Sequence, residues 1–228
     1  MNHKLKVLYL EDDPDLGEIT TDILTREGFL VEWVNNGHEG LEAINSQTFD
    51  IVITDIMMPQ LDGYTFLQTL RENGNTIPLI LLSARVLTED VLKGFAIGAD
   101  DYMRKPFSVE ELIVRMKKLL KDASLISPVI HTVAIGNYLY NPNTYELTLE
   151  DQSYKLSPRS GEILYRFATY KNGILPRKET LIDLWGDDNF FNGRSLDVFI
   201  SKLRKQLADD PRISIINIRA IGYRLIIT

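Results

Sequence analysis

The first half of this 228-residue chain contains short runs of consecutive apolar residues, which constrain its fold more than any other feature. Residues 4–10, 50–55 and 78–84 form such runs, and segments with helical spacing of apolar residues separate them. A strand that is apolar on both faces is covered on both sides, as in a parallel sheet between two layers of helices. With weaker strands at 30–35 and 101–104, we expect a doubly wound, five-stranded parallel α/β domain. Its helices are expected near 15–27, 38–46, 64–73, 88–97 and 109–121.

The expected strands end in acidic and polar residues. Chemistry gathers at the carboxyl ends of the strands in such a sheet, where this chain has Glu11, Asp12, Asp13, Asp55, Ser83 and Lys105. Two charges about 4 Å apart interact by roughly 4 kcal/mol at an effective dielectric near 20, so clustered carboxylates need a cation to stay ionised together. Mg²⁺ binds one or two carboxylates and a phosphate oxygen, which fits Glu11, Asp12 and Asp55 at a site that receives a phosphoryl group.

The other residues at this edge fit the same chemistry. Asp55 can act as the nucleophile, Ser83 can donate a hydrogen bond to the phosphate, and Lys105 supplies a fixed positive charge. Strand-end acids can also be solvated turn or cap residues, and Glu11 and Asp12 taken alone fit either interpretation.

The composition excludes several other kinds of site and points to two domains. There is no cysteine, which excludes disulfides, thiolate metal sites and thiol catalysis. No apolar run reaches the ~18 residues that span a bilayer, and the start of the chain resembles a buried strand rather than a signal peptide, so we expect a cytoplasmic protein without membrane attachment. Residues 1–124 carry 12 Lys and Arg against 21 Asp and Glu, whereas residues 125–228 carry 13 against 11. This asymmetry favours a regulatory domain joined to an anion-binding one, although chance scatter between small domains also explains it.

The second half predicts an antiparallel meander followed by three helices and a hairpin. Residues 129–156 are rich in strand-forming and turn residues, with helices expected at 158–170, 176–185 and 195–207 and hairpin strands at 213–218 and 223–227. The third helix has one apolar face, and its polar face and flanks carry Arg194, Ser201, Lys202, Arg204 and Lys205. Such a helix can enter the DNA major groove, but an ordinary surface helix explains the charges equally well.

The motifs of the first half resemble those of the receiver domains of bacterial two-component response regulators. They are Glu11-Asp12-Asp13-Pro14, the run from Asp55 to Gly63, Leu82-Ser83-Ala84-Arg85, and the run from Gly98 to Phe107. The resemblance implies that Asp55 accepts a phosphoryl group from a sensor histidine kinase. It also implies that Glu11, Asp12, Asp55 and the Met57 carbonyl bind Mg²⁺, that Lys105 contacts the phosphate, that Ser83 and Tyr102 form a switch pair, and that Lys105–Pro106 is cis. A haloacid-dehalogenase-type phosphatase would need a second aspartate where this chain has Met57.

Within the response regulators, the chain resembles the OmpR/PhoB subfamily. That resemblance implies a homodimer face of cross-subunit salt bridges in which Asp100, Asp101, Glu111 and Arg115 match. Val91 and Ala96 depart from the charged residues usual at their positions, which leaves Glu111 and Lys117 without their usual partners.

The second half resembles the winged-helix effector domain of the same subfamily, through residues 181–186, 194–207 and 222–225. The resemblance implies that the helix from Ser195 reads the major groove of double-stranded DNA and that residues 218–223 form a wing. Arg219 would reach the minor groove, Trp185 and Arg194 would approach phosphates, and further contacts would come from Ser201, Lys202, Arg204 and Lys205. Three positions depart from the pattern: Gly161 replaces a bulky residue and predicts a looser core, Ala220 replaces the wing glycine, and Ser201 replaces an arginine.

The sequence therefore predicts a receiver at 1–122, a linker at 123–129 and a winged-helix domain at 130–228. We expect a phosphorylation-dependent transcriptional regulator that dimerises on phosphorylation and whose only enzyme-like chemistry is Mg²⁺-dependent self-phosphorylation and self-dephosphorylation at Asp55. Two alternatives remain open at this point. The chain could bind DNA constitutively, or its second half could bind RNA polymerase or another protein instead of DNA.

Overall fold

The computed structural model of the chain describes residues 4–84, 88–124, 132–170, 173–186, 188 and 190–228. The chain divides into two compact units, Met1–Leu120 and Lys121–Thr228, close to the predicted boundary. Most of the predicted linker, 123–129, lies outside the described residues. Among the helices that are described, none has the length and apolar character of a membrane span.

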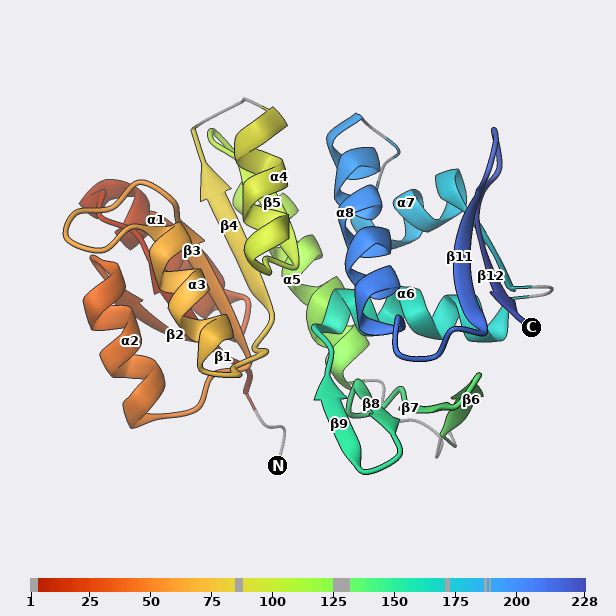
Figure 1. Ribbon diagram of the computed structural model, residues 1–228. Helices are drawn as coiled ribbons and strands as arrows, with labels where there is room; N and C mark the ends of the chain where they lie inside the picture. The colour runs from red at the N-terminus through yellow and green to blue at the C-terminus, as the bar shows by residue number, and fades with distance from the viewer. Residues whose placement is uncertain (1–3, 85–87, 125–131, 171–172, 187, 189) are drawn as a thin grey trace. The chain divides into compact units, whose positions relative to one another are not determined.

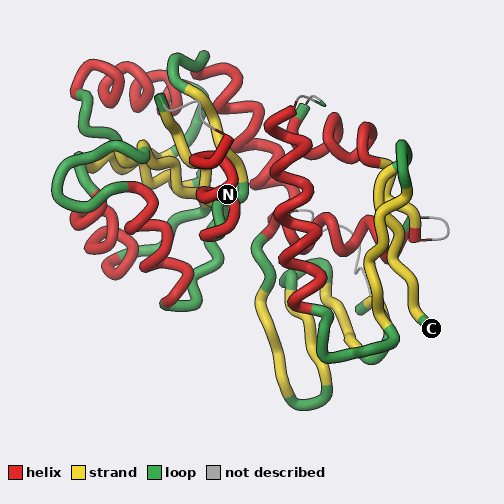
Figure 2. The backbone as a smooth tube through the Cα atoms, turned by 45° about the horizontal axis from the view of Figure 1, so that its top comes forward, coloured by secondary structure: helices red, strands yellow, loops and turns green. Residues whose placement is uncertain are grey.

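The first unit is the predicted doubly wound α/β domain. Its parallel sheet has the strand order β2-β1-β3-β4-β5, with helices packed on both faces (Figures 1 and 2). The strands are β1 (Lys6–Leu10), β2 (Leu30–Val34), β3 (Ile51–Asp55), β4 (Leu79–Ser83) and β5 (Asp101–Arg104). The helices are α1 (Pro14–Arg26), α2 (Gly37–Ser46), α3 (Gly63–Glu72), α4 (Thr88–Ile97) and α5 (Val109–Ser124).

The strand order brings the carboxyl ends of the central strands to one edge of the sheet. Strand β1 pairs with β2 on one side and β3 on the other, so the chain changes direction across the sheet at this point. Residues that follow β1 and β3 therefore meet at one edge. Asp13 fixes the turn after β1, because its side chain accepts hydrogen bonds from the first backbone amides of α1.

The second unit contains two antiparallel sheets and three helices. The four-stranded meander consists of β6 (Val133–Ile135), β7 (Tyr138–Asn141), β8 (Glu146–Leu149) and β9 (Gln152–Lys155). It is followed by α6 (Pro158–Thr169), β10 (Ile174–Pro176), α7 (Arg177–Trp185), α8 (Phe190–Gln206), β11 (Ile213–Ile218) and β12 (Gly222–Ile227). Strands β10, β12 and β11 form a three-stranded sheet, of which only the β11–β12 hairpin was predicted.

Two expectations for this unit are wrong. Helix α8 begins at Phe190 rather than at Ser195, and Ser195 is a buried residue inside the helix. Gly161 does not loosen the core: a Cβ at this position would lie 2.3 Å from the Tyr145 ring and 2.8 Å from the Tyr140 hydroxyl. The two tyrosines fill the space that a bulky residue on α6 would take, so the core requires glycine there.

Candidate functional site

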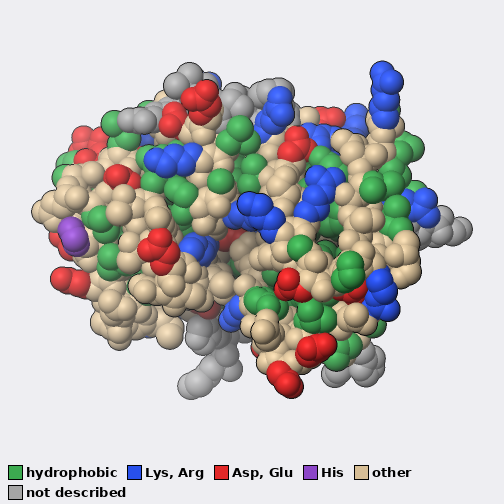
Figure 3. All heavy atoms as spheres, viewed as in Figure 1, with side chains coloured by type: hydrophobic (Ala, Val, Ile, Leu, Met, Phe, Trp, Pro, Cys, Tyr) green, Lys and Arg blue, Asp and Glu red, His purple; other side chains and the backbone are tan. Residues whose placement is uncertain are grey.

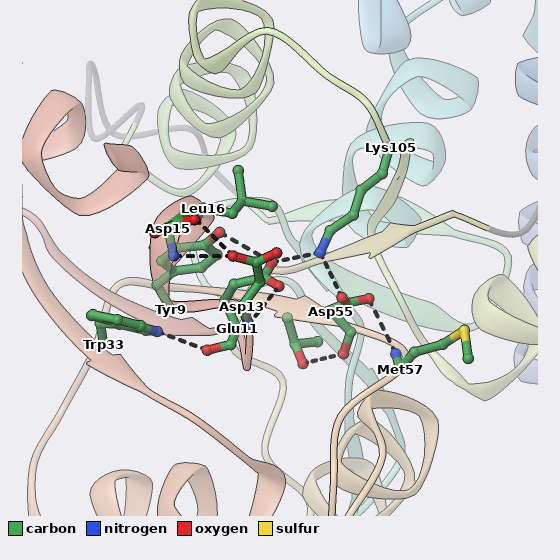
Figure 4. A network of polar contacts seen from close by, with 10 residues as sticks. Tyr9, Glu11, Asp13, Asp15, Leu16, Trp33, Asp55, Met57 and Lys105 are labelled. Atoms are coloured by element: carbon green, nitrogen blue, oxygen red, sulfur yellow. Dashed lines mark hydrogen bonds and ion pairs between the residues drawn. The ribbon is translucent and has the colours of Figure 1, made fainter. Parts of the chain in front are cut away.

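Lys105 lies at the centre of a cluster of charges above the sheet (Figure 4). Its ammonium nitrogen is 2.6 Å from Glu11 Oε2 and 2.5 Å from Asp55 Oδ2. Glu11 directly follows β1, and Asp55 is the last residue of β3. Lys105 follows β5, and its backbone N–H donates to the Ser83 carbonyl at the end of β4. The fold therefore brings together residues from four neighbouring strand ends, as the sequence predicted.

The carboxylates of Glu11, Asp12 and Asp55 can hold a divalent cation together. One oxygen from each lies within 4.8 Å of the others. Glu11 and Asp55 are buried and Asp12 is exposed, so one side of the group remains open to water. Mg²⁺ prefers oxygen ligands and keeps several waters, and this donor set fits both requirements. Met57, the remaining predicted ligand, lies beside Asp55 and donates its backbone N–H to Asp55 Oδ1 at 3.1 Å.

The electrostatics of the cluster follow from its burial. Burial alone would lower the pKa of Lys105, but the hydrogen bonds and charges of Asp55 and Glu11 outweigh it and raise that pKa. Lys105 is therefore a permanent cation at neutral pH. Burial raises the pKa of Glu11, and the negative charge of Asp55 nearby raises it further. The hydrogen bond and charge of Lys105 oppose this effect without cancelling it.

Two residues that the sequence analysis did not single out support Glu11. The Tyr9 hydroxyl donates to Glu11 Oε2 at 3.2 Å, and the Trp33 indole N–H donates to the Glu11 carbonyl at 2.8 Å (Figure 4). The signal for Tyr9 was available, because residues two apart on a strand point to the same face. Trp33 comes from β2, and only the strand order brings it to this position.

The predicted switch residues lie on adjacent strands. Ser83 ends β4 and is fully buried, whereas Tyr102 on β5 is half-buried and packs at a tilt against Phe95 of α4, with 6.4 Å between ring centroids. The Lys105–Pro106 peptide is cis, as the resemblance implied.

The predicted dimer residues separate into two groups. Asp100 does not lie on a surface: it is fully buried and accepts hydrogen bonds from the Arg71 guanidinium and the Leu79 amide. In contrast, Arg115 bridges Asp101 at 3.1 Å and the exposed Glu111 at 2.8 Å within one chain.

The two departures, Val91 and Ala96, differ in burial, because Ala96 is exposed on α4 and Val91 is not. Val91 is buried in the core and faces no charged partner on the surface. Lys117 has a partner in its own chain, Glu27, at 3.4 Å. Glu111 and Lys117 are therefore both paired without a second subunit.

In the second unit, one side of α8 is basic and exposed. Lys and Arg side chains lie over α8 and at the free end of the β11–β12 hairpin (Figure 3). Most of the side chains predicted to contact DNA are exposed: Arg194, Ser201, Arg204, Lys205 and Arg219. Lys202 is half-buried, and its ammonium lies 5.7 Å from the Phe199 ring centroid. Trp185 is buried. A groove of about 740 Å³ between α8 and the hairpin is lined by Ser201, Arg204 and Arg219.

Trp185 does not face this groove. Its side chain is only 3% exposed, and its ring packs against Phe199 and the Arg159 guanidinium. Its indole therefore belongs to the core and cannot present itself to a phosphate, so we leave it out of the interface.

Arg177 connects the elements that form the groove, and the sequence analysis missed it. Its guanidinium lies 2.5 Å from Asp197 on α8, donates to the Tyr223 hydroxyl on β12 at 2.9 Å, and donates to the Gly193 carbonyl at 2.7 Å. No sequence signal separates Arg177 from other arginines that begin a helix, because its partners lie 16 or more residues away.

The hairpin tip keeps the shape that a glycine would give it. Ala220 has a φ of 64°, in the left-handed region, and the Ile221 N–H donates to the Ile218 carbonyl at 3.1 Å. Ala220 therefore adopts a backbone conformation that ordinarily favours glycine.

Comparisons with known proteins cover both units. Residues 7–117 match the family model for a response regulator receiver domain, and residues 151–225 match that for the C-terminal domain of transcriptional regulatory proteins. The chain is 40% identical over 227 residues to the transcriptional regulatory protein RprY of Bacteroides fragilis, covering 99% of this chain and 96% of that protein. It is 33% identical over 225 residues to DltR of Streptococcus agalactiae, covering 97% and 98%. The structure of DrrB, an OmpR/PhoB homolog from Thermotoga maritima, superposes with a TM-score of 0.53 and 26% identity over 98% of this chain and 100% of DrrB.

Proposed function

Because this chain belongs to the OmpR/PhoB family of two-component response regulators, which joins a receiver domain to a DNA-binding domain that regulates transcription, we propose that phosphorylation of Asp55 by a sensor histidine kinase controls its binding to DNA. The observation that carries the proposal is the cluster of Glu11, Asp12, Asp55 and Lys105 at one edge of the sheet. Both partners, kinase and chromosomal DNA, meet the protein in the cytoplasm.

The phosphoryl transfer uses Asp55 as the nucleophile. A carboxylate oxygen attacks the phosphorus of the kinase phosphohistidine, the phosphorus–nitrogen bond breaks, and its electron pair stays on the imidazole nitrogen. Lys105 pairs with Asp55 Oδ2 before the attack and with a phosphoryl oxygen afterwards. Glu11, Asp12, Asp55 and the Met57 carbonyl would hold Mg²⁺, which when bound supplies positive charge to the phosphoryl oxygens. With acetyl phosphate the bond that breaks is phosphorus–oxygen and acetate leaves. When water attacks the phosphorus, the phosphorus–oxygen bond to Asp55 breaks, inorganic phosphate leaves, and Asp55 returns to its free carboxylate.

The change at Asp55 is transmitted through the strand ends beside it. The phosphoryl group draws Ser83 inward, and the Ser83 hydroxyl donates a hydrogen bond to it. Tyr102 then turns inward into the space that Ser83 has left. The face that carries the exposed Glu111 and the half-buried Arg115 then favours a homodimer. The buried Asp101 holds Arg115 from within the same chain, so in a dimer the pair of Arg115 and Glu111 would contact the second subunit.

The dimer binds paired half-sites on double-stranded DNA. In each subunit α8 enters the major groove, and Arg219 on the wing reaches the minor groove. Contacts with phosphates or base edges come from Arg194, Lys202 and Lys205. Ser201 and Arg204 line the protein groove between α8 and the wing. The support for this arrangement is the basic, exposed side of α8 and its groove facing the hairpin.

The test compares the wild-type protein with Asp55→Asn after incubation with Mg²⁺ and acetyl phosphate. We expect the intact mass to rise by one phosphoryl group, light scattering to report a dimer, and affinity for DNA duplexes selected from a random pool to increase. All three changes should be absent in Asp55→Asn. The matched control is Asp22→Asn, which removes an exposed carboxylate on α1 outside the cluster and should respond like wild type.

A salt titration tests whether the second unit binds nucleic acid. Contacts with phosphates make the logarithm of the binding constant fall with the logarithm of salt concentration by about 0.9 per phosphate. A flat titration would contradict DNA binding. An Asp55→Asn protein that still dimerised with acetyl phosphate would contradict the role of Asp55.

A further inference from the structure

Tyr9 connects the hydrophobic core of the receiver domain to the acidic cluster. It lies on β1, is fully buried, and belongs to the core cluster that includes Ile53 of β3 and Met116 of α5. Its hydroxyl donates to Glu11 Oε2 at 3.2 Å. Because packing fixes the ring, the direction of this hydroxyl is fixed as well.

Glu11 Oε2 has two donors, and one of them is needed elsewhere during the reaction. Lys105 approaches this oxygen at 2.6 Å and Tyr9 at 3.2 Å, while Oε1 is 3.4 Å from the Asp13 amide. In the proposed mechanism Lys105 pairs with the phosphoryl group of Asp55, so its bond to Glu11 weakens at that stage. The Tyr9 hydroxyl is then the donor that remains on Oε2, and the long contact from the Asp13 amide remains on Oε1.

The side chain of Glu11 needs such a restraint. A glutamate has one more rotatable bond than an aspartate, and ordering a long side chain costs conformational entropy. The Trp33 indole fixes only the backbone carbonyl of Glu11. Among the contacts of the described residues, the one that fixes the carboxylate from within the core is the Tyr9 hydroxyl.

We propose that Tyr9 is a positioning residue that holds the Glu11 carboxylate in the orientation required to bind Mg²⁺, independently of where Lys105 points. This role rests on the proposed function, because it assigns Glu11 as a magnesium ligand.

The test is the Mg²⁺ affinity of the full chain without phosphodonor, measured by titration calorimetry for wild type, Tyr9→Phe, Glu11→Asp and the double variant. The Tyr9→Phe change removes one hydroxyl and keeps the ring in the core. The hydrogen bond from Tyr9 to Glu11 is also present without Mg²⁺, so only part of its free energy contributes to the Mg²⁺ affinity. We therefore expect about a 3- to 10-fold loss of Mg²⁺ affinity in Tyr9→Phe. In the Glu11→Asp background the side chain is shorter by about 1.5 Å and no longer reaches Tyr9, so we expect no further loss.

The matched control is Tyr64→Phe. Tyr64 is also a buried tyrosine of this domain, and its hydroxyl donates to the Asp90 carbonyl rather than to the cluster. It should bind Mg²⁺ like wild type. Trp33 fluorescence supplies a second readout, because its indole bonds directly to Glu11.

The outcomes separate the inference from the proposed function. Unchanged affinity in Tyr9→Phe, or an equal loss in the Glu11→Asp background, would overturn the role of Tyr9 while the magnesium site stands. A wild-type protein that does not bind Mg²⁺ would overturn the magnesium site of the proposed function and the role of Tyr9 with it.

Discussion

Replacement of Lys105 by methionine separates two roles of this residue that work against each other. In the proposed mechanism the ammonium group pairs with a phosphoryl oxygen, but before the reaction it is paired with the Glu11 and Asp55 carboxylates that would also bind Mg²⁺. Lys105→Met keeps a similar side-chain volume and removes the charge. We therefore expect the variant to bind Mg²⁺ more tightly than wild type and yet to show no increase in DNA affinity with acetyl phosphate.

The structure sets the size of the gain in Mg²⁺ affinity. A unit charge and a divalent cation about 4 Å apart repel by about 8 kcal/mol at an effective dielectric of 20, which is a ceiling for the repulsion between the ammonium group and bound Mg²⁺. Asp12 is exposed and admits water, so only part of this energy applies. We expect a gain of about 1.4 to 2.8 kcal/mol, which corresponds to about 10- to 100-fold tighter binding.

Calorimetry gives the affinity, and thermal unfolding of the full chain gives an independent check. Because a ligand that binds only the folded state stabilises it, the receiver domain of Lys105→Met should gain more stability from Mg²⁺ than the wild-type domain does. Lys117→Met, which removes the lysine that pairs with Glu27, is the control and should bind Mg²⁺ like wild type. Equal or weaker Mg²⁺ binding in Lys105→Met would refute the argument that the two cations compete.

Three further predictions follow from the second unit. Gly161→Ala should lower the free energy of unfolding by up to about 2 kcal/mol, because the overlap with Tyr145 costs about 1–3 kcal/mol against a gain of about 1 kcal/mol in helix propensity; a higher urea midpoint would contradict this. Arg177→Gln should weaken DNA binding about 10-fold with normal phosphodonor-induced dimerisation, because α8 loses its bond through Asp197; equal affinity in a DNA titration would count against it. The Arg212 guanidinium and backbone amides hold the pKa of Asp210 well below its usual range, so its contribution to stability is present above about pH 4 and is lost as the pH falls further. Acid unfolding of Asp210→Asn should accordingly depend less on pH than that of wild type.

The sheet and the acidic cluster could be predicted because both depend on local patterns. The apolar runs of β1, β3 and β4 specify strands that are buried on both faces, and the residues after them must meet at one edge. The same logic would have identified Tyr9, since it lies two residues before Glu11 on the same face of the chain.

Other features depend on tertiary contacts that no local pattern contains. Asp100 resembles a surface acid in the sequence, but it is buried because the guanidinium of Arg71 on α3 donates a hydrogen bond to it in the interior. Gly161 resembles a defect until Tyr145 is placed beside it. Strand β10 was missed because it has only three residues and ends in proline, and it exists because Gly222 to Arg224 of β12 provide a partner. In each case the deciding residue is distant in sequence.

The turn at Ala220 has a consequence for how the DNA specificity of such proteins can evolve. The tip holds its left-handed conformation with an ordinary L-residue, and the short backbone bond across it does not involve side chains. The residues at the tip, Arg219 among them, can therefore be exchanged by mutation while the hairpin backbone stays the same. Under the proposed function, in which Arg219 reaches the minor groove, selection can then change this contact one residue at a time, without a simultaneous change in α8.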